Sequence, residues 1–304
     1  MTAVGRHAAL VGATASGKSD LALALARRDP TWELVSVDSM QVYRGMDIGT
    51  AKPSLAERDE VPHHLIDLLD AWDDGTVAWF QREAREVIAG IEARGRRALL
   101  VGGTGLYVQA VVDDLDIPSQ YPAVRDDLES DEDTAGLHRR LSELDPLAAS
   151  RMEPGNRRRV LRALEVTLGS GRPFSSYGPG LQARPPTPFK LIGLSIPPVE
   201  LAVRIEQRYR DQLTAGFLDE VATLRAHPRG ISRTAAQALG YKELLAHLAG
   251  ECTLDEAVEL AVRRTRRFAR RQRAWFGRDE RITWLDAGEG SANLLVDRMG
   301  HLVG

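Results

Sequence analysis

The chain has 304 residues, enough for one large domain or for a domain with a smaller companion. Hydrophobic residues make up 43% and charged residues 27%, proportions that exclude a disordered or a membrane-embedded chain. No apolar stretch approaches the roughly 20 residues of a membrane helix, and the first residues do not resemble a signal peptide, so no membrane partner is expected. The single cysteine, Cys252, excludes an internal disulfide and a thiolate zinc site and fits a reducing, cytoplasmic location.

The net charge of −3 argues against a nucleic-acid partner, but the charge is unevenly distributed. Residues 263–281 hold nine arginines against two acidic residues, a local charge of +7, so the rest of the chain carries −10. Such asymmetry is typical of a localised polyanion-binding surface. Five of these arginines recur at helical spacing, which predicts one basic helical face that contacts phosphates. They are Arg263, Arg266, Arg267, Arg270 and Arg271.

Apolar, strand-like segments alternate with helical ones in the first 117 residues. A short apolar stretch at 7–11 precedes a glycine-rich loop, and an alanine-rich helix is expected at 20–28. A strand at 34–37, a helix at 77–94 and a strand at 98–101 follow in chain order. This alternation predicts an α/β fold with a doubly wound parallel sheet.

The middle of the chain differs from its flanks. Residues 118–188 contain helical patterns and no good strand, and their last part is rich in proline and glycine. We interpret them as a helical insertion domain. A strand at 189–196 returns to the sheet, helices dominate from 198 to 276, and a short strand is expected at 282–285. The expected core domain therefore combines 1–117 with 189–304 and ends in basic helices.

The glycine-rich loop has the sequence GATASGKS and matches the P-loop pattern G-x-x-x-x-G-K-[ST] between a strand and a helix. Backbone N–H groups of such a loop point at a phosphate, and the helix dipole favours negative charge there. Lys18 adds a full positive charge, and the Ser19 hydroxyl suits a Mg²⁺ ion. The expected diphosphate-binding residues are Gly12, Ala13, Thr14, Ala15, Ser16, Gly17, Lys18 and Ser19.

The loop alone does not show which phosphate it binds. A nucleotide site normally has an aspartate after a neighbouring strand, yet the strand at 98–101 ends in Gly-Gly-Thr. Asp38 is the acidic residue at the end of an expected strand near the loop. Lys18, Asp38 and Thr104 all follow strands, so we expect one cleft at the carboxyl edge of the sheet to collect them.

Seven motifs occur in the order of a known family: GATASGKS, SVDSMQVYRGMDIGTAKP, VPHHLID, VGGTGLY, RRRVLRALEV, QALGYKE and TRRFARRQRAWF. The chain resembles the tRNA dimethylallyltransferases, also called tRNA isopentenyltransferases, over about residues 8 to 285. Two departures are mild. Ser19 stands where threonine is common, and Gly105 stands where a larger residue is frequent.

The resemblance implies transfer of a dimethylallyl group from dimethylallyl diphosphate to the exocyclic N6 amine of the adenosine that follows the tRNA anticodon, with Mg²⁺ as cofactor. Lys18 would stabilise the departing diphosphate, and Asp38 would accept or orient the amine proton. Thr104 would help hold the adenine. A Mg²⁺ ligand or a turn residue remains an alternative for Asp38, as does a simple helix N-cap for Thr104.

The resemblance implies the anticodon stem-loop of tRNA as the partner. A stacked adenosine there must leave the stack to reach such a cleft. By resemblance the contact residues are Asp38, Ser39, Met40, Gln41, Thr104, Arg125, Arg158, Arg159 and Arg162, in addition to the basic face. A solvated helix face is the plain alternative for the last three arginines. We expect a monomer, since no heptad or exposed apolar stripe is evident.

Three other functions fit parts of the sequence. A P-loop small-molecule kinase would explain the loop and Asp38, but not the basic helix or GGTGLY. A prenyltransferase acting on free AMP would not need an RNA-binding helix. A non-catalytic RNA-binding module would not need an intact Gly-Lys-Ser loop with an aspartate opposite.

Overall fold

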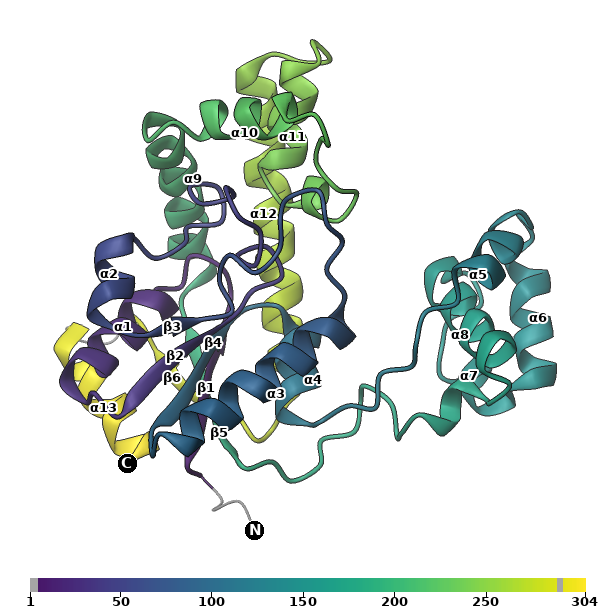
Figure 1. Ribbon diagram of the computed structural model, residues 1–304, viewed down its shortest axis with the longest axis horizontal. Coiled ribbons are helices and arrows are strands. Elements are labelled where there is room, and N and C mark those ends of the chain that lie inside the picture. Colours follow the sequence, from purple (N-terminus) through teal and green to yellow (C-terminus); the bar gives the residue numbers. More distant parts are fainter. Residues whose placement is uncertain (1–4, 289–291) are drawn as a thin grey trace. The chain divides into compact units, whose positions relative to one another are not determined.

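The computed structural model describes residues 5–288 and 292–304 and divides into two compact units (Figure 1). The core unit comprises Met1–Val112 and Thr187–Gly304, and the insertion unit comprises Asp113–Pro186. The insertion expected at 118–188 begins and ends a few residues later than this unit. None of the helices in the described ranges is long and apolar enough to cross a membrane.

A single sheet of six parallel strands forms the centre of the core unit (Figure 1). Its strand order is β3-β2-β4-β1-β5-β6, so β1 lies in the interior between β4 and β5. The strands are β1 (His7–Gly12), β2 (Trp32–Val37), β3 (His63–His64), β4 (Arg97–Gly102), β5 (Phe189–Ser195) and β6 (Thr283–Asp286). This confirms the predicted α/β class with a parallel sheet.

Helices cover both faces of this sheet because alternate strand residues point to opposite sides. Ala9 and Val11 of β1 belong to one apolar cluster, whereas Ala8 and Leu10 belong to the other. The second cluster is closed by α1 and α13, and the first by α3, α4, α9 and α12. The core-unit helices are α1 (Lys18–Arg28), α2 (Leu55–Glu60), α3 (Val77–Ala93), α4 (Gly105–Val112), α9 (Pro198–Thr214), α10 (Phe217–Ala226), α11 (Tyr241–Leu248), α12 (Leu254–Phe276) and α13 (Ala292–Val303), with a 3₁₀ turn at Ala235–Gln237.

The insertion unit is helical and has its own core. Four helices pack around Leu137, Leu141, Val160 and Leu164, all of which are buried. The elements are α5 (Pro122–Glu129), α6 (Thr134–Leu144), α7 (Pro146–Ser150) and α8 (Arg157–Ser170), followed by a 3₁₀ turn at Phe174–Ser176. Local signals set the bounds of α8, since the Asn156 side chain accepts a hydrogen bond from the N–H of Arg159 and Gly171 ends the helix with φ +70°.

Candidate active site

The P-loop joins the carboxyl end of β1 to the first turn of α1. Gly17 caps α1 in the left-handed conformation, with φ +91°, which glycine adopts without steric cost. Lys18 is therefore the first helical residue, and its amine donates to the carbonyl of Ala13 at 2.5 Å. The side chain folds back across the loop, as a phosphate-binding lysine must.

Lys18 is buried, and burial lowers the pKa of its amine to about 8. The neighbouring charge of Asp38 acts in the opposite direction, and that of Arg208 lowers the pKa further. The hydrogen bond that the Lys18 amine donates goes to the neutral Ala13 carbonyl and not to a carboxylate. A bound anion would supply the missing counter-charge.

Two hydroxyls of the loop differ in their surroundings. The Ser16 hydroxyl is buried and has no hydrogen-bond partner among the described residues, which is unusual for a buried polar group. The Ser19 side chain is exposed in the first turn of α1. Both oxygens are thus available to a ligand in the loop.

Arg208 is a site residue that the sequence analysis did not identify. It projects from α9, donates to the Thr14 hydroxyl at 3.1 Å and to the Gly49 carbonyl at 3.3 Å, and forms no ion pair in the described part of the chain. Burial lowers the pKa of its guanidinium, while the charges of Tyr209 and Asp38 raise it. The P-loop therefore has a second cation beside it, contributed by a helix nearly 200 positions later in the chain.

Asp38 directly follows β2. In the sheet, β4 lies between β2 and β1, the strand that leads into the P-loop. Its Oδ1 accepts the N–H of Met40 at 2.8 Å, so part of the carboxylate stabilises a turn, one of the expected alternatives. Its charge acts on Lys18, on Arg208 and on Tyr107, whose pKa is raised to about 12 by burial first and then by Tyr43 and Asp38. The carboxylate therefore lies close to both cations.

The segment after Asp38 is held in place from several helices. Glu220 of α10 accepts the N–H groups of Asp47, Ile48 and Gly49, and it also accepts the hydroxyl of Tyr241. These contacts give a structural role to Asp47, Ile48 and Gly49 of the YRGMDIGTAKP motif and to Tyr241 of the QALGYKE motif.

The residues of this segment expected to contact RNA are not equally available. Gln41 accepts from the Ser36 hydroxyl at 2.7 Å and donates to the Thr50 and Ala51 carbonyls, so its amide is already used. Ser39 and Met40 are partly exposed, and Met40 also packs on the core.

Thr104 lies between β4 and α4, at the same edge of the sheet as the P-loop. Its carbonyl accepts the N–H groups of Tyr107 and Val108. The next residue, Gly105, has no room for a side chain, since an added Cβ would lie 2.4 Å from the Trp275 indole. Trp275 thus occupies the space that a side chain at position 105 would need, and position 105 is where VGGTGLY departs from the usual family motif.

The structure separates the predicted basic face of α12 into paired and unpaired arginines. Arg266 forms an ion pair with Glu206 at 3.0 Å and donates to the Ala202 carbonyl, and Arg263 lies 3.5 Å from Glu259. Three exposed arginines have no ion pair in the described residues: Arg267, Arg270 and Arg271. The same holds for Arg273, which flanks the expected face, and for Arg278, which lies after α12.

The insertion unit shows the same division. Arg125 pairs with Glu129 at 2.7 Å, and Arg162 pairs with the buried Glu165 at 2.7 Å. Arg158 and Arg159 are exposed and, within the described ranges, unpaired. Only these two of the four expected contact arginines offer a free guanidinium.

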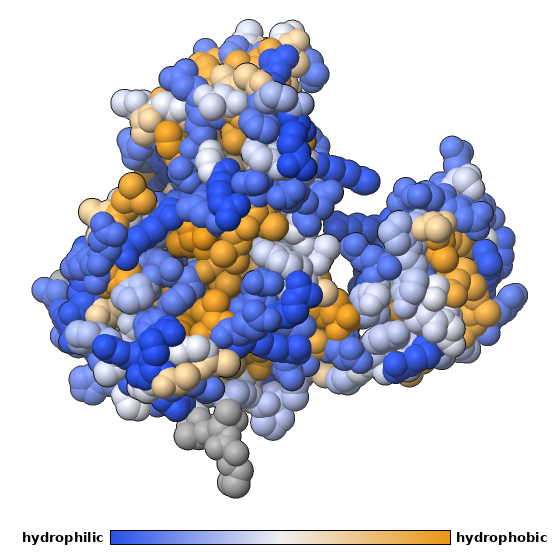
Figure 2. Space-filling model, viewed as in Figure 1, coloured by the Kyte–Doolittle hydropathy of each residue, from blue (hydrophilic) through white to orange (hydrophobic). Residues whose placement is uncertain are grey.

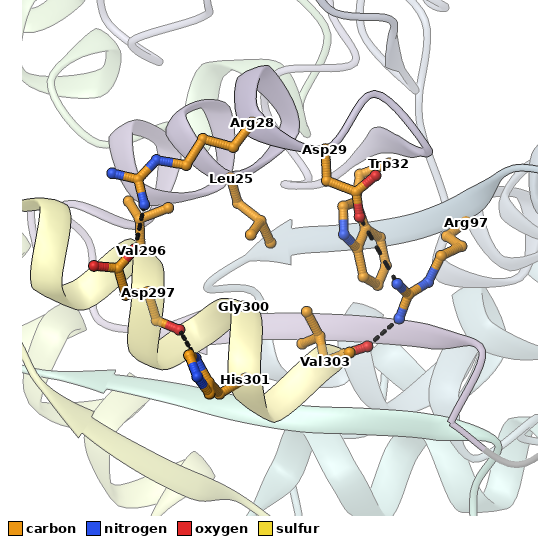
Figure 3. Close-up of a pocket in the computed structure, with 11 residues that line it drawn as sticks. Leu25, Arg28, Asp29, Trp32, Arg97, Val296, Asp297, Gly300, His301 and Val303 are labelled. Carbon is orange, nitrogen blue, oxygen red and sulfur yellow. Dashed lines mark hydrogen bonds and ion pairs between the residues drawn. The ribbon is translucent and has the colours of Figure 1, made fainter.

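A separate cavity lies at the amino ends of the strands, lined by α1, α13, β2 and β4 (Figure 3). Its volume is about 270 Å³. The Arg97 guanidinium stacks on Trp32, 3.9 Å from the ring centre, and donates to the Val303 carbonyl. Arg28 pairs with Asp297 on another wall. Because these charged groups satisfy one another, we assign the cavity to the packing of α13.

The fold and the site together define an enzyme class. A parallel α/β sheet with a P-loop, two cations and a carboxylate at its carboxyl edge is an arrangement that binds a phosphate-containing substrate. The chain belongs to the IPP transferase family, since the model described as IPP transferase matches residues 41–279. A second model, isopentenyl transferase, matches residues 6–68.

Curated and solved relatives agree with this assignment. The chain is 48% identical to a tRNA dimethylallyltransferase of Kineococcus radiotolerans, covering 95% of this chain and 93% of the relative, and 49% identical to one of Streptomyces coelicolor, covering 93% and 91%. The crystal structure of a tRNA isopentenylpyrophosphate transferase from Bacillus halodurans matches with a TM-score of 0.71 and 37% identity, covering 98% and 97%. A eukaryotic dimethylallyltransferase acting on tRNA matches with a TM-score of 0.76 and 28% identity, covering 93% and 74%.

Proposed function

We propose that this transferase moves a dimethylallyl group from dimethylallyl diphosphate to the exocyclic N6 amine of the adenosine immediately 3′ of the anticodon in tRNA. The observation that carries the proposal is the pair of cations, Lys18 and Arg208, beside Asp38, in a chain whose relatives are named tRNA dimethylallyltransferases. Nothing in the site or the relatives favours a small-molecule kinase or an AMP prenyltransferase.

The reaction exchanges one bond for another. A carbon–nitrogen bond forms to the amine, the allylic carbon–oxygen bond breaks, and diphosphate leaves with the bonding electrons. Lys18, Arg208 and the N–H groups of the P-loop stabilise the negative charge that develops on the leaving group. Asp38 takes up or orients the amine proton. Thr104 holds the adenine at the same edge of the sheet.

The donor set fits Mg²⁺, which prefers oxygen ligands and retains several waters. The Ser16 hydroxyl is buried and has no partner in the part of the chain that the structure describes, and the Ser19 hydroxyl is exposed at the start of α1. We propose Ser19 as the protein ligand, with the diphosphate oxygens as the others. The ion would neutralise charge on the diphosphate.

The dimethylallyl group of the donor is apolar and needs an apolar surface near the P-loop. Figure 2 shows an apolar patch on the visible face of the core unit, where the loops between β2 and α3 lie. Met40 and Ile48 from these loops are partly buried apolar residues beside the core. We propose that the dimethylallyl group packs on this surface.

For the tRNA we propose two contact regions. The unpaired arginines of α12 bind phosphates near the cleft, and Arg158 and Arg159 of the insertion unit bind the RNA as a separate surface. We also propose that the protein acts as a monomer in the cytoplasm.

The test is transfer of labelled dimethylallyl from its diphosphate to an unmodified tRNA whose anticodon is followed by adenosines. Free AMP and ATP without RNA are the controls. Label on the tRNA alone supports the proposal. Label on AMP would assign the free-nucleotide reaction, and ATP consumption without label transfer would assign a kinase.

A further inference from the structure

One side chain connects three parts of the site. Gln272, on α12, accepts the backbone N–H of Thr14 through Oε1 at 2.8 Å. Its Nε2 donates to the backbone carbonyl of Gly103, also at 2.8 Å. The helix with the unpaired arginines is thereby hydrogen-bonded to the P-loop and to the loop that ends in Thr104.

The orientation of this amide is fixed by its partners. A backbone N–H only donates and a carbonyl only accepts, so the oxygen must face Thr14 and the nitrogen must face Gly103. The side chain is 5% exposed, so water does not compete for either bond. Gly103 permits the approach, because a Cβ there would lie 2.3 Å from Nε2.

These two bonds act on the loops we assign to the two substrates. The Thr14 N–H is turned toward Gln272, which leaves the following N–H groups of the P-loop for the diphosphate. The Gly103 carbonyl is fixed one residue before Thr104. The length of one glutamine side chain therefore sets the spacing between the diphosphate cradle and the acceptor side of the cleft.

We propose that Gln272 is a positioning residue that holds these two loops in register, so that the allylic carbon and the amine meet at reacting distance. The role rests on the proposed function, because it assigns one loop to each substrate. Gln272 itself touches neither substrate. The flanking Arg271 and Arg273 face solvent, so α12 contacts RNA on one side and sets the loop spacing on the other.

A matched control is present on the same helix. Thr265 is also buried on α12, and its hydroxyl bonds to the Tyr209 hydroxyl at 2.9 Å without touching either loop. Gln272→Met keeps the length of the side chain and removes both bonds, whereas Thr265→Val removes one bond from the helix. Both variants are compared with the wild type by thermal unfolding, by calorimetry with inorganic diphosphate and Mg²⁺, and by steady-state kinetics.

Gln272→Met is expected to weaken diphosphate binding about 10-fold and to lower kcat up to about 100-fold, the loss typical of a misplacement near 1 Å. Its affinity for tRNA should stay within about twofold of the wild type, because the arginines are unchanged. Thr265→Val should lose thermal stability with little change in either quantity. Equal kinetic losses in the two variants, or a Gln272→Met enzyme with wild-type diphosphate affinity and kcat, would overturn the proposal.

Gln272→Glu is a second variant that tests the proposal if the Gln272→Met protein does not fold. It keeps the side-chain length and the acceptor for Thr14, but it points an oxygen at the Gly103 carbonyl and adds negative charge beside the diphosphate loop. Diphosphate affinity should fall by at least as much as in Gln272→Met, and unchanged affinity would count against the proposal. Diphosphate binding is measured without RNA, so it tests Gln272 even if the wild type prenylates an acceptor other than tRNA.

Discussion

Arg208 of α9 donates a hydrogen bond from Nη1 to the Thr14 hydroxyl at 3.1 Å, which places a guanidinium at the edge of the P-loop. The charge has no ion-pair partner in the described residues, and burial lowers its pKa. A charge kept in this state is disfavoured until an anion binds. We therefore propose that Arg208 binds the diphosphate.

Arg208→Gln should weaken the binding of inorganic diphosphate by about 10- to 100-fold, since a hydrogen bond to a charged group contributes about 1.5–3 kcal/mol. Calorimetry with Mg²⁺ present measures this. Arg210→Gln is the control, because Arg210 is exposed on the same helix and pairs with Glu206. An Arg208→Gln protein that binds diphosphate as tightly as the control would remove Arg208 from the site.

The lowered pKa of Lys18 predicts that the affinity for diphosphate depends on pH. This pKa of about 8 in the free protein lies below its ordinary value, chiefly because of burial. A bound diphosphate raises the pKa again, so binding takes up a proton above pH 8, and affinity should fall as pH rises through 8, by up to about tenfold per pH unit. Calorimetry in buffers of different ionisation enthalpy measures the uptake. Lys18→Met should bind more weakly and lose this part of the slope; an unchanged slope would assign the proton to another group.

Asp38→Asn tests the proton step. The variant keeps the Oδ1 acceptor for the Met40 N–H and loses the basic carboxylate. Single-turnover transfer to tRNA should slow by roughly 10²- to 10⁴-fold, the usual contribution of a general base, with tRNA affinity nearly intact. Asp70→Asn, at an aspartate that pairs with Arg44, is the control. Loss of affinity with retained turnover would contradict the assignment.

The arginines of α12 predict a salt-dependent effect with an internal control. Replacing Arg267 and Arg270 by Gln should weaken tRNA binding and reduce the slope of log Kd against log salt by about 1.4, at about 0.7 per phosphate contact on single-stranded RNA. Arg266→Gln should leave that slope unchanged and lower stability instead, because Arg266 pairs with Glu206. Filter binding across a salt series separates the two. Equal slopes in all variants would place the RNA elsewhere.

Much of the core unit's fold could be predicted from the sequence because its signals are local. Buried strands appear as short apolar runs, and the expected strands at 7–11, 98–101 and 189–196 lie within one residue of β1, β4 and β5. The short strand expected at 282–285 corresponds to β6, but two other elements were not anticipated. Strand β3 has only two residues, and α13 follows a segment that the sequence analysis did not assign.

The site could be predicted only where a motif carries it. GATASGKS identifies Lys18 without any knowledge of the fold. Arg208 and Gln272 lie on helices 194 and 258 positions from their Thr14 contact. Arg208 belongs to none of the motifs, and Gln272 belongs to TRRFARRQRAWF, but the sequence does not show that either side chain reaches the P-loop. The same limit applies to charge, because the sequence shows Arg266 and Arg267 as neighbours and only the packing of α9 shows that Arg266 has a partner.

Glu165 gives a prediction for the insertion unit. This buried carboxylate accepts the Tyr121 N–H at 2.8 Å and pairs with Arg162, so it ties α8 to the start of α5. Glu165→Gln keeps the shape and loses the charge, and it should destabilise the insertion unit by about 2 kcal/mol, within the range for a charged hydrogen bond. Limited proteolysis should then cleave within Asp113–Pro186 sooner than in the wild type.

Arg158→Gln with Arg159→Gln is the contrasting double variant. Both arginines are exposed and unpaired in the described part of the unit, so their loss should leave proteolysis and unfolding unchanged while weakening tRNA binding at low salt. Diphosphate binding should be normal in both variants, because the insertion unit contributes no residue to the proposed cradle. If the double variant bound tRNA like the wild type, these arginines would be a solvated helix face, and the RNA contacts would belong to the core unit.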